Sequence, residues 1–394
     1  MLIGLVGKPN VGKSTFFKSA TLSDVLIANY PFATIKPNHG IGYVKIDCID
    51  KELKTQCNPR EGYCINHIRF VPVELMDVAG LVEGASQGKG LGNQFLDDLR
   101  QADAFIQIVD LSGTTDAEGK PTENYYPGQD IRMLENELDK WYLGILKKVW
   151  KTFARTIELS KQKFEESVAK QFTGLKINEY DVKDVVLKGN FDSAKPNSWS
   201  DDELARFASM LRQLTKPMII AGNKIDTEKS KENLDKLKKE FPKLNIVPCS
   251  ADSELALKQA AKAGIIDYLP GEKTFKLRKD LNEKQKQALE SIQKNVLDKY
   301  DQGTGVQFIL NHVVFDLLKY IAVFPAGAKL ADSKGNILPD CYLMPPNSTA
   351  LDFAFKLHTD IGKAFVKAID VRTKMAVGKD YKIKNRDGLE IMTK

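Results

Sequence analysis

The stretch GKPNVGKS at residues 7–14 constrains this chain of 394 residues more than any other. It matches the phosphate-binding pattern G-x-x-x-x-G-K-[ST] in full, it follows an apolar run at residues 2–6, and residues 13–20 can start a helix directly after it. In that setting the glycines let backbone N–H groups surround phosphate oxygens, and the helix N-terminus adds a positive dipole. Lys13 would reach the outer phosphates, and the Ser14 hydroxyl would ligate Mg²⁺. A glycine-rich turn that resembles the pattern by accident is the alternative, and the flanking segments disfavour it.

The composition is that of a folded protein with room for two or three domains, since 42% of the residues are hydrophobic. No apolar run approaches the roughly 20 residues that a membrane-spanning helix needs, and the chain enters its first strand without a charged leader. Five cysteines, an odd number, favour free thiols in a reducing compartment. We therefore expect a cytoplasmic protein without membrane contact, and we expect a monomer.

Two segments have the character of nucleotide switches. Residues 28–40 have neither helical nor strand period, and Thr34 within them can close on Mg²⁺ and a terminal phosphate. A strand at residues 70–76 then delivers the D-x-x-G sequence of residues 77–80, in which Asp77 can hold the Mg²⁺ hydration shell and the Gly80 N–H can reach a γ-phosphate. The glycine-rich residues 81–93 are expected to order only when a nucleotide or a partner holds them.

A third segment is suited to reading a nucleotide base. The strand at residues 217–222 leads into N-K-x-D at residues 223–226. The Asp226 carboxylate can accept from the N1–H and N2–H groups of guanine, whereas adenine lacks the N2 amino group, so GTP is favoured over ATP. The stem of Lys224 can cover one face of the base, and Asn223 can tie this motif to the phosphate loop. Ser250 and Ala251, after a strand at residues 245–248, can offer backbone N–H groups to guanine O6.

The pattern between these motifs predicts four parts. Residues 1–129 and 206–304 form the two halves of a nucleotide-binding domain, the second with a connecting helix, and residues 305–394 form a C-terminal domain. Residues 130–205 form a helical insertion, a hairpin or short coiled coil, with apolar side chains at helical intervals, including Leu134, Leu138, Tyr142, Leu146, Val149 and Phe153. In the C-terminal domain, Thr349 and Asp352 can form a capping box at the start of a helix, after which Leu351, Phe355, Ile361 and Phe365 can cover one strand face. Residues 319–394 carry 13 basic against 8 acidic side chains. This excess suggests a polyanionic partner, although a solvated surface explains the charge equally well.

The segment with Cys48, Cys57, Cys64 and His67 invites comparison with zinc sites. Its gaps of eight, six and two residues lack the C-x₂-C element that is typical of structural zinc. We therefore favour free thiols in a loop over a metal site.

Longer runs carry a resemblance to a known family. The sequences GKPNVGKSTFF (7–17), NYPF (29–32), DVAGLVEGA (77–85) and GKGLGNQFL (88–96) resemble the Obg family of GTPases, and specifically its YchF subfamily. Residues 320–325, 340–346 and 381–391 resemble a TGS module of β-grasp fold, so the resemblance covers essentially the whole chain. It implies an α/β P-loop GTPase with a mostly parallel sheet in three layers. It also implies a ribosomal partner, the large subunit above all, or structured RNA, bound through the TGS module and the helical arm.

The chain departs from relatives in instructive ways. Bacterial YchF proteins often prefer ATP and carry a variant at the position of Asp226, and some relatives have a histidine where residues 111–129 have none. Leu81 replaces the water-positioning glutamine of Ras-like proteins, and Asn10 matches the asparagine of relatives that bind a monovalent cation. We expect slow GTP hydrolysis that K⁺ or a ribosomal partner accelerates. The alternatives are a nucleotide-sensing binding module with little turnover and an ATP-preferring stress regulator.

These interpretations define a set of site residues for GTP or GDP, Mg²⁺ and, as a hypothesis, K⁺. The catalytic candidates are Lys13, Thr34, Gly80 and Asn10, and the metal ligands are Ser14, Thr34 and Asp77. The nucleotide contacts are Gly7, Asn10, Val11, Gly12, Lys13, Ser14, Thr15, Asn223, Lys224, Asp226, Ser250 and Ala251.

Overall fold

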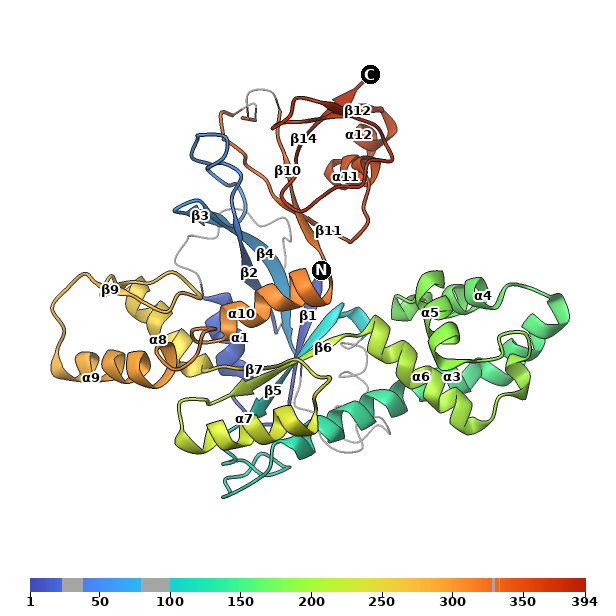
Figure 1. The fold of residues 1–394 in the computed structure, drawn as a ribbon, viewed down its shortest axis with the longest axis horizontal. Helices are drawn as coiled ribbons and strands as arrows, with labels where there is room; N and C mark the ends of the chain where they lie inside the picture. Colours follow the sequence, from blue (N-terminus) through green and yellow to red (C-terminus); the bar gives the residue numbers. More distant parts are fainter. Residues whose placement is uncertain (23–37, 79–99, 328–329, 333) are drawn as a thin grey trace.

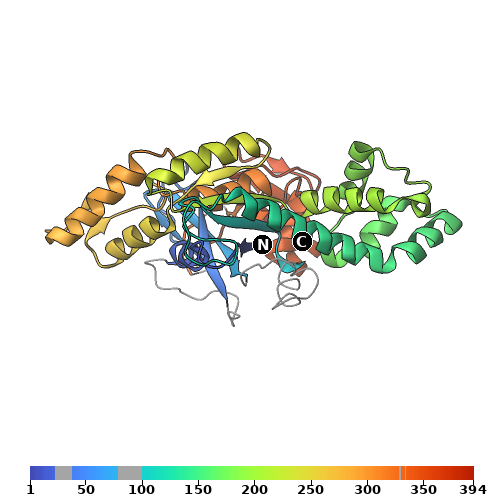
Figure 2. The same ribbon diagram turned by 90° about the horizontal axis from the view of Figure 1, so that it is seen from below.

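The computed structural model describes residues 1–22, 38–78, 100–327, 330–332 and 334–394. Thr34, Gly80 and Leu81 lie outside the described residues, so their predicted roles stay predictions. A central sheet carries a helical arm on one side, a small lobe around α9 on the other, and a C-terminal module above (Figure 1). Figure 2 shows the arm and the lobe at opposite ends of the molecule.

The central sheet is mostly parallel, as predicted. Its strands run in the order β2-β4-β1-β5-β6-β7, with β3 paired to β4. The pairs of β1 with β4 and β5, β5 with β6, and β6 with β7 are parallel, whereas β2 and β3 run antiparallel to β4. The strands are β1 (Leu2–Val6), β2 (His39–Asp47), β3 (Tyr63–Ile65), β4 (Ile68–Asp77), β5 (Ala104–Asp110), β6 (Met218–Asn223) and β7 (Ile246–Pro248).

Helices cover both faces of this sheet and complete three layers. In β1 the side chains alternate between two cores, Ile3 and Leu5 on one face and Leu2 and Val6 on the other. Residues of α1 (Lys13–Thr21), α8 (Ala251–Lys262) and α10 (Val306–Asn311) contribute to the first core. Residues of α3 (Gly128–Ser160) and α7 (Glu228–Glu240) pack on the other face. The predicted three-layer fold is therefore confirmed.

The arm is thicker than the predicted hairpin or coiled coil. Helices α3 and α6 (Asp201–Thr215) pack together, and α4 (Phe164–Gln171) and α5 (Glu179–Gly189) fill the end of the arm. The aromatic core includes Trp150 and Phe207, whose ring centroids lie 5.9 Å apart. Trp150 takes the place that we predicted for Val149, which is 36% exposed, because the buried face of α3 continues from Leu146 in steps of four residues and the prediction changed to a step of three.

The arm also extends beyond the predicted residues 130–205. Helix α3 begins at Gly128, and α6 continues to Thr215. The start of α6 is marked by a capping box in which the Ser200 side chain accepts from the Glu203 N–H, 3.2 Å away, so the helix that returns to the sheet begins near the end of the predicted insertion.

The segment that follows β7 forms a lobe and then returns to the sheet. The lobe contains β8 (Ile266–Asp267), β9 (Lys276–Leu277) and α9 (Glu283–Ile292). Helix α10 and the π-helical turn His312–Leu317 bury Val306, Ile309 and Val313 in the same core as β1. The prediction that the C-terminal domain begins at residue 305 is therefore wrong, since residues 306–317 pack on the nucleotide-binding domain.

The C-terminal module is a mixed five-stranded sheet of order β11-β10-β14-β12-β13, crossed by a helix. Its helix α11 begins at Ala350, and the side chain of the preceding N-cap residue, Thr349, accepts from the Asp352 N–H as predicted. Phe353 is fully buried whereas Phe355, which we had placed in the core, is 45% exposed. The elements are β10 (Ile321–Pro325), β11 (Tyr342–Met344), α11 (Ala350–Leu357), α12 (Thr359–Lys363), β12 (Phe365–Asp370), β13 (Ala376–Val377) and β14 (Gly388–Thr393).

Within the described parts of the chain, no helix combines the length and the apolar character that crossing a membrane requires.

Candidate nucleotide-binding site

The phosphate loop lies between β1 and α1 and is bonded to the end of β6. Gly12 has a φ of 92°, in the left-handed region that favours glycine. A Cβ at Gly12 would lie 2.2 Å from Asn223 Nδ2, the atom that donates to the Val11 carbonyl oxygen at 2.9 Å. Glycine is thus required for Asn223 to reach the loop, and the predicted tie between the two motifs is present.

The metal end of the site brings together three predicted residues. Ser14 Oγ donates to Asp77 Oδ2 at 3.2 Å, and Lys13 Nζ lies 3.3 Å from Asp77 Oδ1. Asp77 Oδ1 is buried and accepts no hydrogen bond within the described residues. A hydroxyl beside a carboxylate whose buried oxygen accepts no hydrogen bond is a donor set that suits Mg²⁺, a cation that prefers oxygen ligands. The residues present therefore fit the predicted metal.

The base end of the site is formed by the residues after β6 and β7. Asp226 is exposed, and Ser250 Oγ donates to its Oδ1 at 3.2 Å. The Ala251 N–H donates to Asn223 Oδ1 at 3.0 Å, and the Ser250 N–H donates to the Thr304 carbonyl oxygen at 2.9 Å. Both N–H groups that we assigned to guanine O6 therefore have protein acceptors. In this structure Ser250 and Ala251 orient Asp226 and Asn223 instead.

Lys224 is held in position by a partner that the sequence did not reveal. Its Nζ donates to Asp110 Oδ2 at 2.8 Å, from a backbone with a φ of 64°. Burial by itself raises the pKa of Asp110, but hydrogen bonds from Lys224 and Ser112 outweigh burial and lower that pKa below its usual range. The signal available in the sequence was an acidic residue at the end of a strand next to β6. Asp110 thereby fixes the Lys224 side chain beside the base end.

Lys8, the second residue of the phosphate-loop motif, faces away from the phosphate end. Its side chain is fully buried, its Nζ lies 2.8 Å from Asp130 Oδ2, and it donates to the Thr115 carbonyl oxygen at 2.9 Å. The same nitrogen lies 3.7 Å from the centre of the Tyr125 ring, and burial raises the pKa of Asp130. Nothing in the motif marks this residue, because its role depends on where α3 begins. Lys8 joins the phosphate loop to the first turn of the arm.

Asn10 is also bonded to the segment ahead of the arm. It has a φ of 61°, and its Nδ2 donates to the Gly119 carbonyl oxygen at 2.9 Å. This bond engages the amide nitrogen, so the amide oxygen is the atom with which Asn10 would ligate a cation. The remaining predicted loop residues, Gly7, Val11 and Thr15, lie in the loop and in the first turn of α1.

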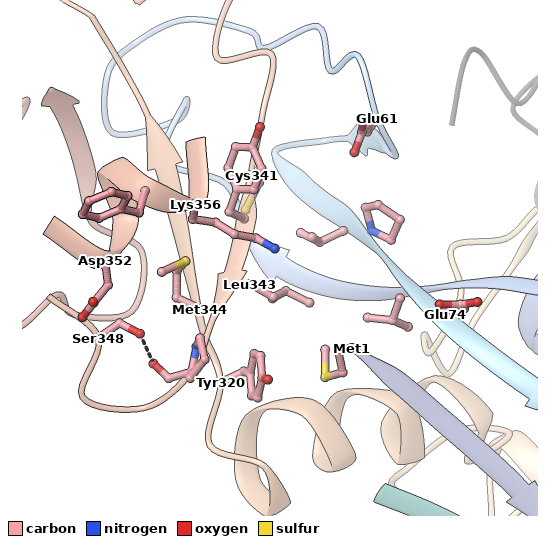
Figure 3. Close-up of a pocket in the computed structure, with 16 residues that line it drawn as sticks. Met1, Glu61, Glu74, Tyr320, Cys341, Leu343, Met344, Ser348, Asp352 and Lys356 are labelled. Carbon is pink, nitrogen blue, oxygen red and sulfur yellow. Dashed lines mark hydrogen bonds between the residues drawn. The ribbon is translucent and has the colours of Figure 1, made fainter. Parts of the chain in front are cut away.

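A hollow of about 680 Å³ lies elsewhere, between the central sheet and the C-terminal module. Figure 3 shows Met1 and Glu74 on the sheet side and Met344 and Lys356 on the side of the module. None of the predicted nucleotide or metal residues that the structure describes lines it. It marks the joint between two domains rather than the nucleotide site.

Comparisons with known families match three segments of the chain. Residues 2–150 match the family "50S ribosome-binding GTPase". Residues 221–327 match the "Obg-like GTPase YGR210-like, G4 motif-containing domain", and residues 321–393 match the TGS domain.

Individual relatives extend over the whole length. A GTP-binding protein of Methanocaldococcus jannaschii is 48% identical over 394 residues, which cover 100% of this chain and 99% of the relative. The ribosome-binding ATPase YchF of Mycoplasma genitalium is 33% identical over 288 residues, 68% of this chain and 70% of the relative. The crystal structure of a GTP-binding protein from Pyrococcus horikoshii OT3 superposes with a TM-score of 0.79 at 42% identity, with both chains fully covered.

The fold and the site together define a P-loop nucleotide-binding protein with a helical insertion and a C-terminal TGS domain. This chain belongs to the Obg family of GTPases, in the YchF subfamily. The YchF GTPase of Schizosaccharomyces pombe, at 22% identity and a TM-score of 0.59, shares the fold.

Proposed function

We propose that this protein binds GTP, hydrolyses it slowly and acts as a switch on the ribosome. The observation that carries the proposal is the exposed carboxylate of Asp226, which Ser250 orients. Asn223 links this end of the site to the phosphate loop, because its side chain bonds to both Val11 and Ala251. A carboxylate in this place pairs with the N1–H and N2–H groups of guanine. With adenine it would face an acceptor and lose both bonds.

The hydrolytic step would rest on charge and position. Ser14 and Asp77, with Thr34 from outside the described residues, would hold Mg²⁺, which when bound supplies positive charge to the phosphate oxygens. Lys13 would exchange its contact with Asp77 for the β- and γ-phosphates. The side chain of Leu81 has no hydrogen-bonding group to orient water, so the intrinsic rate would be low. The Asn10 amide oxygen would recruit K⁺ and add positive charge on the other side of the phosphates.

The ribosomal partner is supported by two independent observations. Several relatives, from Mycoplasma genitalium and Bacillus subtilis among others, are named ribosome-binding ATPases. The TGS domain is basic, and Lys363, Lys367 and Lys374 are exposed on it. Their charge would engage the phosphates of ribosomal RNA. The names of these relatives also favour a second candidate, an ATP-dependent protein, which the intact N-K-x-D sequence argues against.

A nucleotide panel tests the base preference. Fluorescent GTP and ATP analogues are titrated into the wild type, Asp226→Asn and Asp235→Asn, the last an exposed aspartate on α7 that serves as the matched control. We expect GTP to bind the wild type about 100-fold more tightly than ATP, and Asp226→Asn to lose most of that ratio. Equal affinities, or a ratio that Asp235→Asn changes as much as Asp226→Asn, would contradict the assignment to guanine.

Cosedimentation tests the ribosomal role. The full chain is spun with ribosomes in GDP and in a non-hydrolysable GTP analogue, beside a variant in which Lys363, Lys367 and Lys374 are all changed to Glu. A matched control changes Lys231, Lys236 and Lys239 of α7 to Glu. Nucleotide-dependent binding that only the TGS variant weakens is expected. Ribosome binding that depends neither on the nucleotide nor on the TGS lysines would argue against the switch. GTP hydrolysis that ribosomes do not accelerate would favour a sensing module.

The cation hypothesis has its own measurement. Hydrolysis by the wild type is expected to be faster in K⁺ than in Na⁺ buffer, and Asn10→Ala is expected to abolish that difference. Equal rates in both salts for the wild type would reject a role for K⁺ while leaving the GTP assignment in place.

A further inference from the structure

The loop between β2 and β3 gathers three of the five cysteines at one edge of the central sheet. Cys48 directly follows β2, Cys57 lies in the loop, and Cys64 lies in β3. Strands β2 and β3 pair with opposite edges of β4, and the Cys48 N–H donates to the His67 carbonyl oxygen at 2.8 Å. Strand pairing therefore brings together side chains that are far apart in the sequence.

The spacing of the four candidate ligand atoms fits a tetrahedral metal. Cys48 Sγ lies 3.6 Å from Cys57 Sγ, and Cys64 Sγ lies 3.8 Å from Asp50 Oδ2. All four ligand atoms, one each from Cys48, Asp50, Cys57 and Cys64, lie within 4.8 Å of one another. A tetrahedral Zn²⁺ with Zn–S bonds of about 2.3 Å and a Zn–O bond of about 2.0 Å sets its sulfurs about 3.8 Å apart and sulfur and oxygen about 3.5 Å apart.

The surroundings of the cluster are those of an anionic centre. The Asp50 side chain is fully buried, and His67 Nδ1 lies 2.9 Å from its Oδ1. Arg69 is also fully buried, and its Nη1 donates to Cys57 Sγ at 3.5 Å and to the Leu338 carbonyl oxygen at 3.0 Å. A buried guanidinium remains charged and is stabilised by an anion nearby. Three thiolates and a carboxylate around a divalent ion would carry two net negative charges, which Arg69 offsets in part.

We propose that Cys48, Cys57, Cys64 and Asp50 bind one zinc ion. Thiolates select zinc over harder cations such as Mg²⁺, and four protein ligands leave no open position for a substrate, so the site is structural. His67 holds the second oxygen of Asp50 and orients the carboxylate from outside the coordination sphere. The site is independent of the nucleotide and goes beyond the proposed GTPase function.

The loop that this zinc would hold is the loop that contacts the C-terminal part of the chain. The Asn58 N–H donates to the Ile337 carbonyl oxygen at 3.0 Å, and the Arg60 N–H donates to the Pro339 carbonyl oxygen at 3.0 Å. Glu52 in the same loop accepts from Arg372 of the TGS domain at 2.6 Å. The zinc therefore braces the TGS domain against the nucleotide-binding domain.

Metal analysis of the full chain tests the site. The wild type, Cys64→Ser and Cys341→Ser are purified under reducing conditions without chelator, and zinc is measured by mass spectrometry of the elements. We expect one zinc per chain in the wild type and in Cys341→Ser, whose cysteine lies outside the cluster, and at least a tenfold loss of occupancy in Cys64→Ser. Loss of zinc from Cys341→Ser to the same degree would overturn the ligand set.

Cobalt titration keeps the proposal testable if Cys64→Ser fails to fold. Zinc is removed from the wild type and Co²⁺ is added, which should give thiolate-to-cobalt charge-transfer absorption and the intense visible bands of tetrahedral cobalt, displaced by one equivalent of zinc. His67→Gln is expected to weaken zinc binding about 10- to 100-fold, and Asp50→Asn, which removes a ligand, by at least as much. A reduced wild type that contains no zinc and binds neither ion overturns the proposal, as does a Cys48–Cys57 disulfide in the metal-free native chain.

Limited proteolysis tests the bracing role on the same samples. Zinc removal is expected to speed cleavage within residues 48–62, and one equivalent of added zinc is expected to restore protection. Cleavage rates in this loop that do not respond to zinc would overturn the bracing role.

Discussion

The phosphate end of the site and the junction between the phosphate loop and the arm use lysine in opposite ways. Lys13 lies 3.3 Å from Asp77 with both side chains partly exposed, and Asp77 keeps a buried oxygen without a hydrogen bond. Lys8, five positions earlier, is fully buried against Asp130 and an aromatic ring. One region leaves polar atoms open for a ligand, whereas the other uses the charge within the protein.

This difference indicates which side of the phosphate loop can change when a nucleotide binds. The contact of Lys13 with Asp77 can exchange for phosphate, but the contact of Lys8 with Asp130 cannot open without leaving a buried charge unpaired. The arm should therefore follow the phosphate loop as a rigid extension. A third lysine, Lys216 at the base of the arm, is 1% exposed and donates to the carbonyl oxygens of Arg100 and Ala102.

Removing the buried charge at the junction should have the largest effect. We expect Lys8→Met to lower the free energy of unfolding by about 3 to 5 kcal/mol, because Asp130 is left buried without its cation. Urea denaturation measures the change. The double variant Lys8→Met with Asp130→Asn should recover most of the loss, and a single variant within about 1 kcal/mol of the wild type would show that the junction is not a tight ion pair.

Removing the charge of Lys13 at the phosphate end should change the rate of GTP hydrolysis and leave the free energy of unfolding nearly unchanged. We expect Lys13→Ala to slow single-turnover GTP hydrolysis by about 10²- to 10³-fold, since a positive charge aimed at the transferring phosphate is lost. Lys18→Ala, on the exposed face of the same helix, is the matched control. A fall in unfolding free energy as large as that of Lys8→Met would remove the distinction between the two lysines.

A smaller effect is expected at Asp110, which holds Lys224. We expect Asp110→Asn to weaken GTP binding about tenfold, about 1.4 kcal/mol, because Lys224 loses the charge that positions it beside the base. Titration of a fluorescent GTP analogue measures the affinity, with Glu118→Gln as an exposed control. Unchanged affinity would mean that Lys224 reaches the base without this partner.

The smallest effect should appear as a pH dependence. Burial lowers the pKa of Lys216 to about 8, so between pH 8 and its ordinary pKa of 10.5 the unfolded chain binds more protons than the folded one. The wild type should therefore gain about 1 kcal/mol of stability relative to Lys216→Met as pH rises from 8 to 9. Below about pH 7, where Lys216 is protonated in both states, the stabilities of the wild type and Lys216→Met should change in parallel. If the unfolding free energies of the two proteins, measured by urea denaturation, depend on pH in the same way across this range, Lys216 titrates normally.

The sequence predicted the local structure well where the residues of one motif are contiguous. The loop at residues 7–14 and the N-K-x-D sequence both lie at strand ends, where the parallel sheet brings them together, and the Asn223 bond to Val11 is present. Predictions within helices were less accurate. The face of α3 was misplaced at Val149, and the face of α11 was misplaced at Phe355, because the buried face depends on what the helix packs against.

At the cysteine cluster the sequence pattern argued against a site that the tertiary structure supports. The sequence gaps argued against a metal site, since they lack a C-x₂-C element. The pairing of β2 and β3 with β4 nevertheless places Cys48, Cys57 and Cys64 within reach of one ion. The rule on sequence spacing applies to zinc sites whose ligands lie in one local turn. In this cluster the ligands are brought together by the pairing of strands.

By itself the sequence determined that a glycine loop joins a strand to a helix N-terminus, because this local arrangement is specified within a few residues, and phosphate binding there remains our proposal. It also determined the order of the domains, with a helical segment between two halves of the sheet. Only the tertiary structure decided that Lys8 faces Asp130, that Asp110 holds Lys224 and that residues 306–317 cover the sheet. Each of these depends on side chains more than 100 residues apart, or on a helix packing against strands from the other end of the chain, and such contacts leave no local pattern.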